Sequence, residues 1–152
     1  MENSEVLLLI EDNGSDIELT KRALERARIA NPLVVADDGQ EALDYIFGEG
    51  AHAGRDVSDL PALILLDLKL PKISGLEVLR RIRQDPRTQR VLVVILTSSN
   101  EQEDVTHGYD AGVNGFVRKP VDSKQFGDAI ASLGLYWLVT NEPPSDAKFR
   151  GA

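Results

Sequence analysis

Four short, uninterrupted runs of apolar residues alternate along the chain with longer stretches of mixed polarity. The runs are residues 6–10 (VLLLI), 33–36 (LVVA), 63–66 (LILL) and 91–96 (VLVVIL). The runs at 6–10, 63–66 and 91–96 are typical of strands that are buried on both faces, as in a parallel sheet covered by helices, and residues 33–36 predict a short strand. Phe116, Val117 and Arg118 follow a turn sequence and predict a shorter last strand. The pattern therefore predicts five strands.

The stretches between the strands carry apolar residues at helical spacing. Ser15 is expected to cap the first helix, with Glu18 three residues later, and Ser74 and Glu77 form the same pair further along. The expected helices begin at residue 15, include residues 42–47, begin at residue 74, cover residues 102–111 and begin near residue 123. Alternating strands and helices with right-handed crossovers predict an α/β fold, a doubly wound five-stranded parallel sheet flanked by five helices.

The length and punctuation of the chain predict one domain. Residues 5–140 are expected to form it, and residues 141–152, with two prolines and few apolar residues, predict a loosely ordered C-terminal extension. Residues 48–61 (GEGAHAGRDVSDLP) are rich in glycine and polar residues. Their G-x-G lacks the third glycine of a dinucleotide-binding loop and follows a helix, so a surface insertion is expected.

The composition excludes several classes of function. The formal net charge of -8 argues against a nucleic-acid surface and an anionic membrane, and the absence of cysteine rules out disulfides and thiolate sites. No apolar run approaches the roughly 20 residues of a membrane span, and the N-terminus lacks a signal-peptide pattern, so a cytoplasmic protein is expected. A local group of arginines is interpreted as a solvated helix face: Arg80, Arg81, Arg83, Arg87 and Arg90.

Polar side chains follow four of the five predicted strands. They are Glu11 and Asp12, Asp67, Thr97 and Lys119. Because the carboxyl ends of parallel strands meet at one edge of the sheet, we expect these side chains to converge there. Three carboxylates at one edge repel each other, and Mg²⁺, which prefers oxygen ligands and commonly works beside phosphate, would relieve that repulsion.

The remaining groups suit phosphoryl chemistry. Lys119 offers a positive charge and Thr97 a hydroxyl donor for phosphoryl oxygens, while Asp67 could accept a phosphoryl group as an acyl phosphate. Simpler interpretations stay open: Asp67 could merely end a strand and cap a turn, Lys119 could lie on the surface, and Thr97 could close its strand.

Motifs in order along the chain resemble the response-regulator receiver domain over residues 5–139. They are LLLIEDN (7–13), LILLDLKLPKISGLEVL (63–79), VILTSS (94–99) and GFVRKP (115–120). This resemblance implies a flavodoxin-like fold with strand order 2-1-3-4-5. It also implies that Asp67 accepts the phosphoryl group. The metal would be held by Glu11, Asp12 and Asp67 together with the backbone carbonyl of Lys69.

The resemblance assigns further roles near the phosphoacceptor. Thr97 and Lys119 would bind phosphoryl oxygens, and Thr97 and Phe116 would form the conformational switch. Glu11 departs from the family's usual aspartate, and Lys69 places a cation two residues beyond Asp67. Both departures bear on the lifetime of the phosphoryl group. The Lys119–Pro120 bond is predicted to be cis.

The expected function is a stand-alone response regulator that takes a phosphoryl group from a sensor histidine kinase. It would signal by conformational switching or by onward transfer to a phosphotransfer protein. The insertion and the ending LYWLVTNEPP resemble free-standing regulators that partner bacterial phytochromes. One alternative is a pseudo-receiver that is never phosphorylated. Another is an aspartyl-phosphate phosphatase, although Lys69 stands where that enzyme class needs a second aspartate.

The last helix predicts a homodimer. Phe126, Ile130, Leu133 and Trp137 suffice to seat it on the sheet. Further apolar residues then remain for its other faces: Leu135, Tyr136, Leu138 and Val139. Such a helix needs a cover, which a second chain would supply through this helix and the C-terminal extension. The alternative is that residues 141–144 fold back over it.

Overall fold

A five-stranded parallel sheet forms the centre of the protein. The structure, a computed structural model, describes residues 6–98, 107 and 109–132. The strands lie in the order β2-β1-β3-β4-β5 and all neighbours are parallel, which confirms the predicted doubly wound, flavodoxin-like sheet. Their bounds are β1 Leu7–Ile10, β2 Leu33–Ala36, β3 Leu63–Asp67, β4 Val93–Thr97 and β5 Gly115–Arg118.

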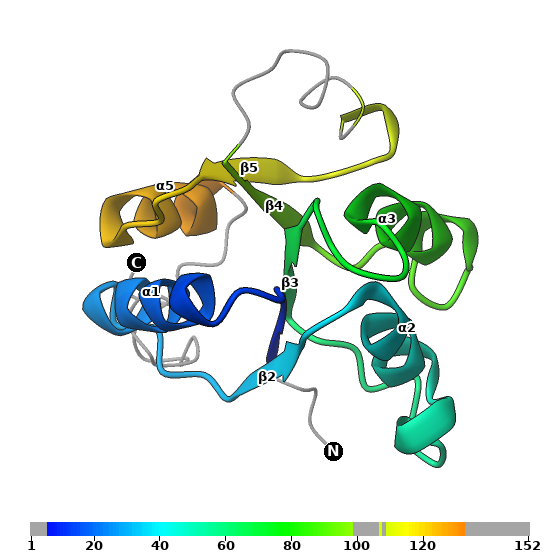
Figure 1. Ribbon diagram of the computed structural model, residues 1–152. Helices are drawn as coiled ribbons and strands as arrows, with labels where there is room; N and C mark the ends of the chain where they lie inside the picture. Colours follow the sequence, from blue (N-terminus) through cyan, green and yellow to red (C-terminus); the bar gives the residue numbers. More distant parts are fainter. Residues whose placement is uncertain (1–5, 99–106, 108, 133–152) are drawn as a thin grey trace, which may run out of the picture.

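Helices cover both faces of the sheet. Their bounds are α1 Gly14–Arg26, α2 Gly39–Phe47, α3 Gly75–Gln84 and α5 Ser123–Ser132, with a short 3₁₀ helix, η1, at Gly50–His52. Figure 1 shows α1 and α5 on one side of the sheet and α2 and α3 on the other. The described residues thus contain four of the five expected helices. The remaining one, expected over residues 102–111, falls mostly outside them.

Alternate residues of the strands pack into two separate hydrophobic layers, one on each face of the sheet. On β1, Leu8 and Ile10 pack with α2 and α3, whereas Leu7 and Leu9 pack with α1 and α5. The central strand β3 is buried along its whole length. This two-sided burial, shared by β1 and β4, explains why these three strands appear as uninterrupted apolar runs, whereas the edge strands β2 and β5 are only partly buried.

Two helix starts were tested by the structure, with different outcomes. Ser74 caps α3 as predicted, because its side chain accepts a hydrogen bond from the Glu77 N–H at 3.2 Å. The prediction that Ser15 caps α1 is wrong. Asn13 is the N-cap, since its Oδ1 accepts from the Asp16 N–H at 2.9 Å, so α1 begins earlier than expected.

The arginine group is only partly a solvated face. Arg80 and Arg81 are exposed and pair with Glu77. Arg83 contradicts the prediction: its guanidinium donates to the carbonyl oxygens of Gly112 at 2.7 Å and Val91 at 2.7 Å, among others. Burial lowers the pKa of Arg83 below its usual value. This side chain ties the end of α3 to the segments before β4 and β5.

The predicted insertion lies on the surface beside α2. Arg55 holds it in place by donating to the carbonyl oxygens of Tyr45 at 2.6 Å and Ile46 at 3.1 Å, and its guanidinium lies 4.3 Å from the centre of the Tyr45 ring. These bonds satisfy carbonyls at the end of α2. Within the part of the chain that the structure describes, no helix is both long and apolar enough to cross a membrane.

Candidate functional site

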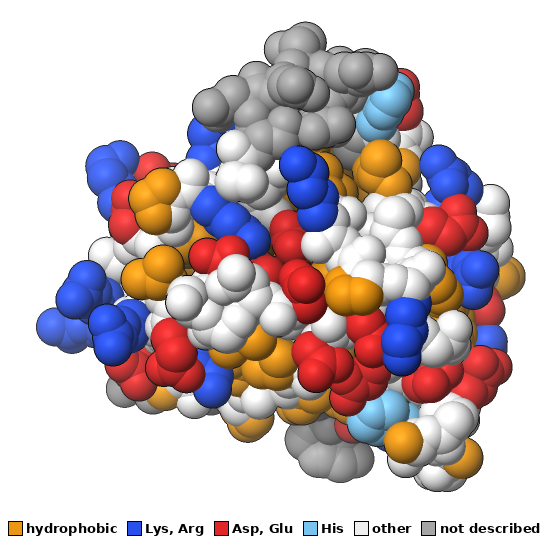
Figure 2. All heavy atoms as spheres, viewed as in Figure 1, with side chains coloured by type: hydrophobic (Ala, Val, Ile, Leu, Met, Phe, Trp, Pro, Cys, Tyr) orange, Lys and Arg blue, Asp and Glu red, His pale blue; other side chains and the backbone are white. Residues whose placement is uncertain are grey.

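The carboxyl ends of the strands bring the predicted polar residues together. Glu11 directly follows β1, Asp67 and Thr97 end β3 and β4, and Lys119 directly follows β5. Glu11, Asp67 and Thr97 are buried. Figure 2 shows acidic and basic side chains next to each other in the middle of this face. The convergence expected from a parallel sheet is therefore present.

Three carboxylates form a group that could hold a metal ion. One oxygen from each of Glu11, Asp12 and Asp67 lies within 4.8 Å of the others. Glu11 and Asp67 are buried, whereas Asp12 is exposed. An all-oxygen set with one open side fits a hard divalent cation that keeps some of its waters.

Lys119 forms the positive centre of the site. Its Nζ donates to Glu11 Oε1 at 2.7 Å and to Asp16 Oδ2 at 3.0 Å, and it lies 3.6 Å from Asp67 Oδ1. Sequence reasoning missed Asp16. The available signal was its place in the first turn of α1, at the same edge of the sheet as Glu11.

Burial shifts the pKa values of the two buried acids in the same direction. Burial raises the pKa of Glu11, and the Asp67 charge adds to this, while Lys119 opposes it. Burial also raises the pKa of Asp67, against the Lys119 charge and a backbone hydrogen bond from Lys69. Burial alone would lower the pKa of Lys119, but its bonds to Glu11 and Asp16 outweigh that effect and raise the pKa. Lys119 therefore stays charged, but its charge does not fully offset the cost of burying the Glu11 and Asp67 carboxylates.

The turn that carries Lys119 is held from both sides. The Lys119–Pro120 peptide bond is cis, as predicted. The Lys119 N–H donates to the Thr97 carbonyl oxygen at 2.9 Å. The Gln125 side chain accepts from the Arg118 N–H at 2.9 Å and donates to the carbonyl oxygens of Arg118 and Pro120, both at 3.1 Å. These bonds fix the backbone on each side of the lysine.

The loop after Asp67 is closely packed. A Cβ on Gly75 would collide with the Asp67 carbonyl oxygen and the Leu68 Cα, so only glycine fits at the start of α3. The Gly75 N–H donates to the Leu68 carbonyl oxygen at 3.0 Å. Lys69, between these anchors, is exposed. Its side chain is therefore free of the core while its backbone is held next to the site.

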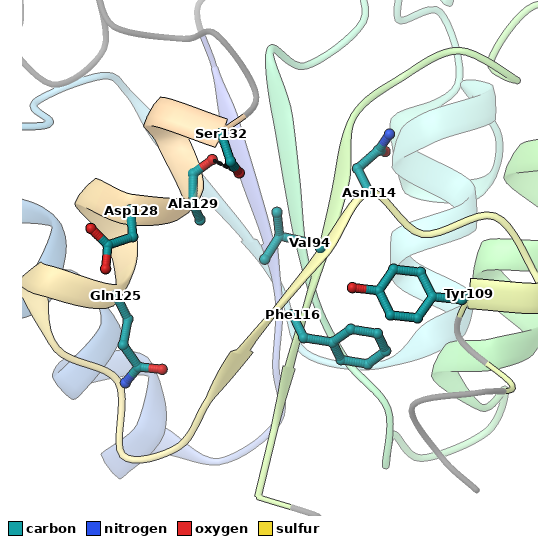
Figure 3. A pocket seen from close by; sticks show the side chains of 9 residues that line it. Val94, Tyr109, Asn114, Phe116, Gln125, Asp128, Ala129 and Ser132 are labelled. Carbon is teal, nitrogen blue, oxygen red and sulfur yellow. Dashed lines mark hydrogen bonds between the residues drawn. The ribbon is translucent and has the colours of Figure 1, made fainter. Parts of the chain in front are cut away.

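Phe116 lies within β5, at one edge of the sheet. Its ring contacts Tyr109 edge to face, with 5.0 Å between ring centres, and it is partly buried against the core. Figure 3 shows both rings at the side of a cavity of about 450 Å³ that extends to Ala129 and Ser132 of α5. Phe116 thus combines a packing position with a place beside an open cavity. The expected dimer residues Leu135, Tyr136, Leu138 and Val139 lie outside the described residues.

The sequence matches the family model "response regulator receiver domain" over residues 7–131. It is 36% identical over 142 residues to the probable methanogenesis regulatory protein FilR2 of Methanothrix harundinacea, covering 93% of this chain and 89% of that protein. It is 35% identical over 140 residues to the response regulator Rcp1 of Synechocystis, covering 92% of this chain and 93% of Rcp1.

Solved structures show the same similarity. The bacteriophytochrome response regulator RtBRR superposes with a TM-score of 0.82 at 50% identity, covering 93% of this chain and 84% of that one. The phosphorylated cyanobacterial phytochrome response regulator RcpA superposes with a TM-score of 0.73 at 37% identity, covering 93% of this chain and 99% of RcpA. The Mn²⁺-bound form of Rcp1 superposes with a TM-score of 0.72 at 34% identity, covering 93% of this chain and 99% of that one.

Proposed function

The chain is a member of the response regulator receiver family, and on this premise we propose that Asp67 accepts a phosphoryl group from a histidine kinase. One observation carries the proposal: Asp67 ends the central strand within one group of oxygen ligands, and the Lys119 ammonium lies 3.6 Å from its Oδ1. In this role the chain is a signalling protein rather than a conventional enzyme. Residues 5–140 would form the receiver domain.

The proposed reaction is a transfer between two side chains. An oxygen of Asp67 attacks the phosphorus of a phosphohistidine and forms an O–P bond. The P–N bond breaks, and its electron pair stays on the imidazole nitrogen of the kinase. Lys119 and the Thr97 hydroxyl bind the phosphoryl oxygens, where charge is concentrated.

Glu11, Asp12, Asp67 and the carbonyl oxygen of Lys69 would hold Mg²⁺. When bound, the ion supplies positive charge to the phosphoryl oxygens during transfer. The geometry that supports this is the close group of three carboxylates, two of them buried. The relative Rcp1 has been solved in a Mn²⁺-bound form.

A bacteriophytochrome-type kinase is the proposed phosphoryl donor. RtBRR and RcpA, which are named as phytochrome response regulators, support this assignment through identity over nearly the whole chain. FilR2 and Rcp1 are covered over most of their own lengths, which supports a stand-alone regulator. Such a protein would signal by changing its conformation or by passing the group to a phosphotransfer protein. It would also form a homodimer through its last helix and C-terminal extension.

Two alternatives remain distinct outcomes of experiment. A pseudo-receiver would lack phosphorylation, but the groups that phosphorylation needs, Asp12, Asp67, Thr97 and Lys119, are all in place. An aspartyl-phosphate phosphatase would need an acid two residues after Asp67, where exposed Lys69 stands.

Incubation with Mg²⁺ and acetyl phosphate, followed by intact-mass measurement, tests the proposal. The wild-type chain should gain one acid-labile phosphoryl group, and Asp67→Asn should gain none because its amide is not a nucleophile. Asp59→Asn, which alters an exposed aspartate in the insertion, is the matched control and should be labelled normally. Labelling of Asp67→Asn on another aspartate would refute the assignment, and an unlabelled wild type would favour the pseudo-receiver.

A further inference from the structure

Lys119 contacts three carboxylates, and only one of them lies outside the proposed metal group. Glu11 and Asp67 belong to the group of possible ligands, whereas Asp16 does not. Asp16 nevertheless lies 3.0 Å from the Lys119 ammonium, closer than Asp67 at 3.6 Å. It is therefore a strong ion-pair partner of the lysine without a competing role at the metal.

Both oxygens of Glu11 are already engaged. Oε1 accepts from Lys119 at 2.7 Å, and Oε2 accepts from the Asn13 N–H at 3.3 Å. A divalent cation at Glu11 would repel the ammonium that occupies Oε1. Lys119 must then weaken its bond to Glu11 when the cation binds.

Lys119 cannot simply be left without a partner. Its side chain is only 12% exposed, and an unpaired ammonium in such a place is costly. Asp16 is ready to hold it, because its backbone N–H is fixed by the Asn13 cap in the first turn of α1. Its side chain is more exposed than the other two acids, so its charge costs less to maintain.

We propose that Asp16 is a positioning residue that keeps the Lys119 ammonium in the site when Mg²⁺ binds at Glu11, Asp12 and Asp67. The proposal rests on the proposed function, because it needs that Mg²⁺ site. By accepting the lysine, Asp16 lowers the competition between ammonium and metal for Glu11. It also keeps Lys119 within reach of the phosphoryl oxygens on Asp67.

Isothermal titration of the whole chain with Mg²⁺ tests this role. Asp16→Asn keeps the shape of the side chain but removes its charge. Lys119 should then pair more strongly with Glu11 and compete more with the metal ion. Mg²⁺ affinity should then fall about three- to tenfold, in the lower part of the range of coupling energies within one charge network. Asp16→Glu keeps the charge and should stay within about twofold of the wild type.

A matched control separates this effect from a general loss of negative charge. Glu18→Gln removes one charge from the same helix, where Glu18 pairs with Lys21 at 3.7 Å. At ordinary salt its effect on Mg²⁺ affinity should stay below about twofold, because distant exposed charges are screened. Circular dichroism should show that all these variants are folded.

A double-variant cycle shows whether Asp16 acts through Lys119. Lys119→Met should bind Mg²⁺ more tightly than the wild type, because the competing ammonium is gone. Adding Asp16→Asn to Lys119→Met should then cost no more than Glu18→Gln does. An equal loss with and without Lys119 would overturn the proposal, since Asp16 would then act on the metal directly.

The remaining outcomes separate this proposal from the proposed function. If the wild type binds Mg²⁺ and Asp16→Asn binds it equally well, the role of Asp16 is wrong and the metal site stands. If the wild type binds no Mg²⁺, the metal site is wrong, and the role of Asp16 falls with it.

Discussion

At the scale of single residues, the site is a balance between one lysine and several acids. Lys119 carries the positive charge that three carboxylates share, and burial raises the pKa values of Glu11 and Asp67 above their usual range. Added positive charge, whether from a metal ion or from a side chain at the edge, should therefore favour the ionised forms of these acids. Lys69 is exposed and follows Asp67 by two residues, and its backbone N–H donates to the Asp67 carboxylate.

We expect Lys69→Asn to shorten the lifetime of the phosphoryl group. A cationic side chain beside an acyl phosphate can pair with it and hinder the attack of water. Its loss should speed dephosphorylation about two- to fivefold, in line with an exposed ion pair. The measurement is the decay of acid-labile phosphate after the donor is removed.

Lys72→Asn is the matched control for this prediction. Lys72 lies in the same loop but forms an ion pair with Asp38 at 3.4 Å. Its φ of 70° is a left-handed conformation that asparagine tolerates, so the loop should keep its shape. The control should lose phosphate at the wild-type rate. Equal or slower loss in Lys69→Asn would count against shielding.

At the scale of elements, the loop between β3 and α3 is set by close backbone packing. Gly75 allows α3 to begin directly against the Asp67 carbonyl oxygen, and Gly39 allows α2 to begin against Ile73 of the same loop. The phosphoacceptor loop is thus held between the starts of two helices. Small shifts of the N-terminus of α2 or α3 should therefore change the position of Asp67.

We expect Gly75→Ala to destabilise the domain and to impair phosphorylation together. The added methyl would meet backbone atoms of Asp67 and Leu68, which cannot move aside as a flexible side chain could. The free energy of unfolding should fall by about 1–3 kcal/mol, as for other overpacked sites. Urea unfolding and acetyl phosphate labelling measure the two effects.

Gly127→Ala tests whether the effect is specific to the loop. Gly127 lies within α5, and a Cβ there would meet no atom within 4 Å. Replacing a helical glycine with alanine should raise the free energy of unfolding by about 0.5–1 kcal/mol. If Gly75→Ala were as stable as the wild type, the close packing would not constrain this loop.

The sequence predicted elements better than it predicted partners. Continuous apolar runs identified β1, β3 and β4 because both of their faces are buried. Strand ends identified the acids of the site because parallel strands share one edge. Arg83 was misread because its carbonyl partners lie outside its own helix, Val91 8 residues and Gly112 29 residues further along the chain. Asp16 was missed for the same reason, since its partner Lys119 is 103 residues away.

At the scale of the whole molecule, the acidic site and the last helix occupy defined places on the sheet. The site lies at the carboxyl edge, while α5 packs on the α1 side of the sheet through buried Phe126. The description of α5 ends at Ser132, and the sequence continues with seven residues, 133–139, that carry no charge. The protein is a monomer if its own chain packs against these residues and a dimer if a second chain does.

We expect the protein to be a homodimer through these residues. From Ala129 to Val139 the sequence has no charged side chain, so a helix there would be apolar nearly all round. A domain of this size has few other elements that could cover the outer face of such a helix, so a second chain is expected to do so. Closed two-fold pairing is the commonest arrangement of such chains. Light scattering at micromolar concentration should return twice the chain mass. Leu138→Glu should halve it, because a charge cannot be buried unpaired between two chains. Leu19→Glu, which makes the same change at an exposed leucine of α1, should leave the dimer intact. A monomeric wild type would show instead that residues 141–144 or another part of the same chain cover the apolar face.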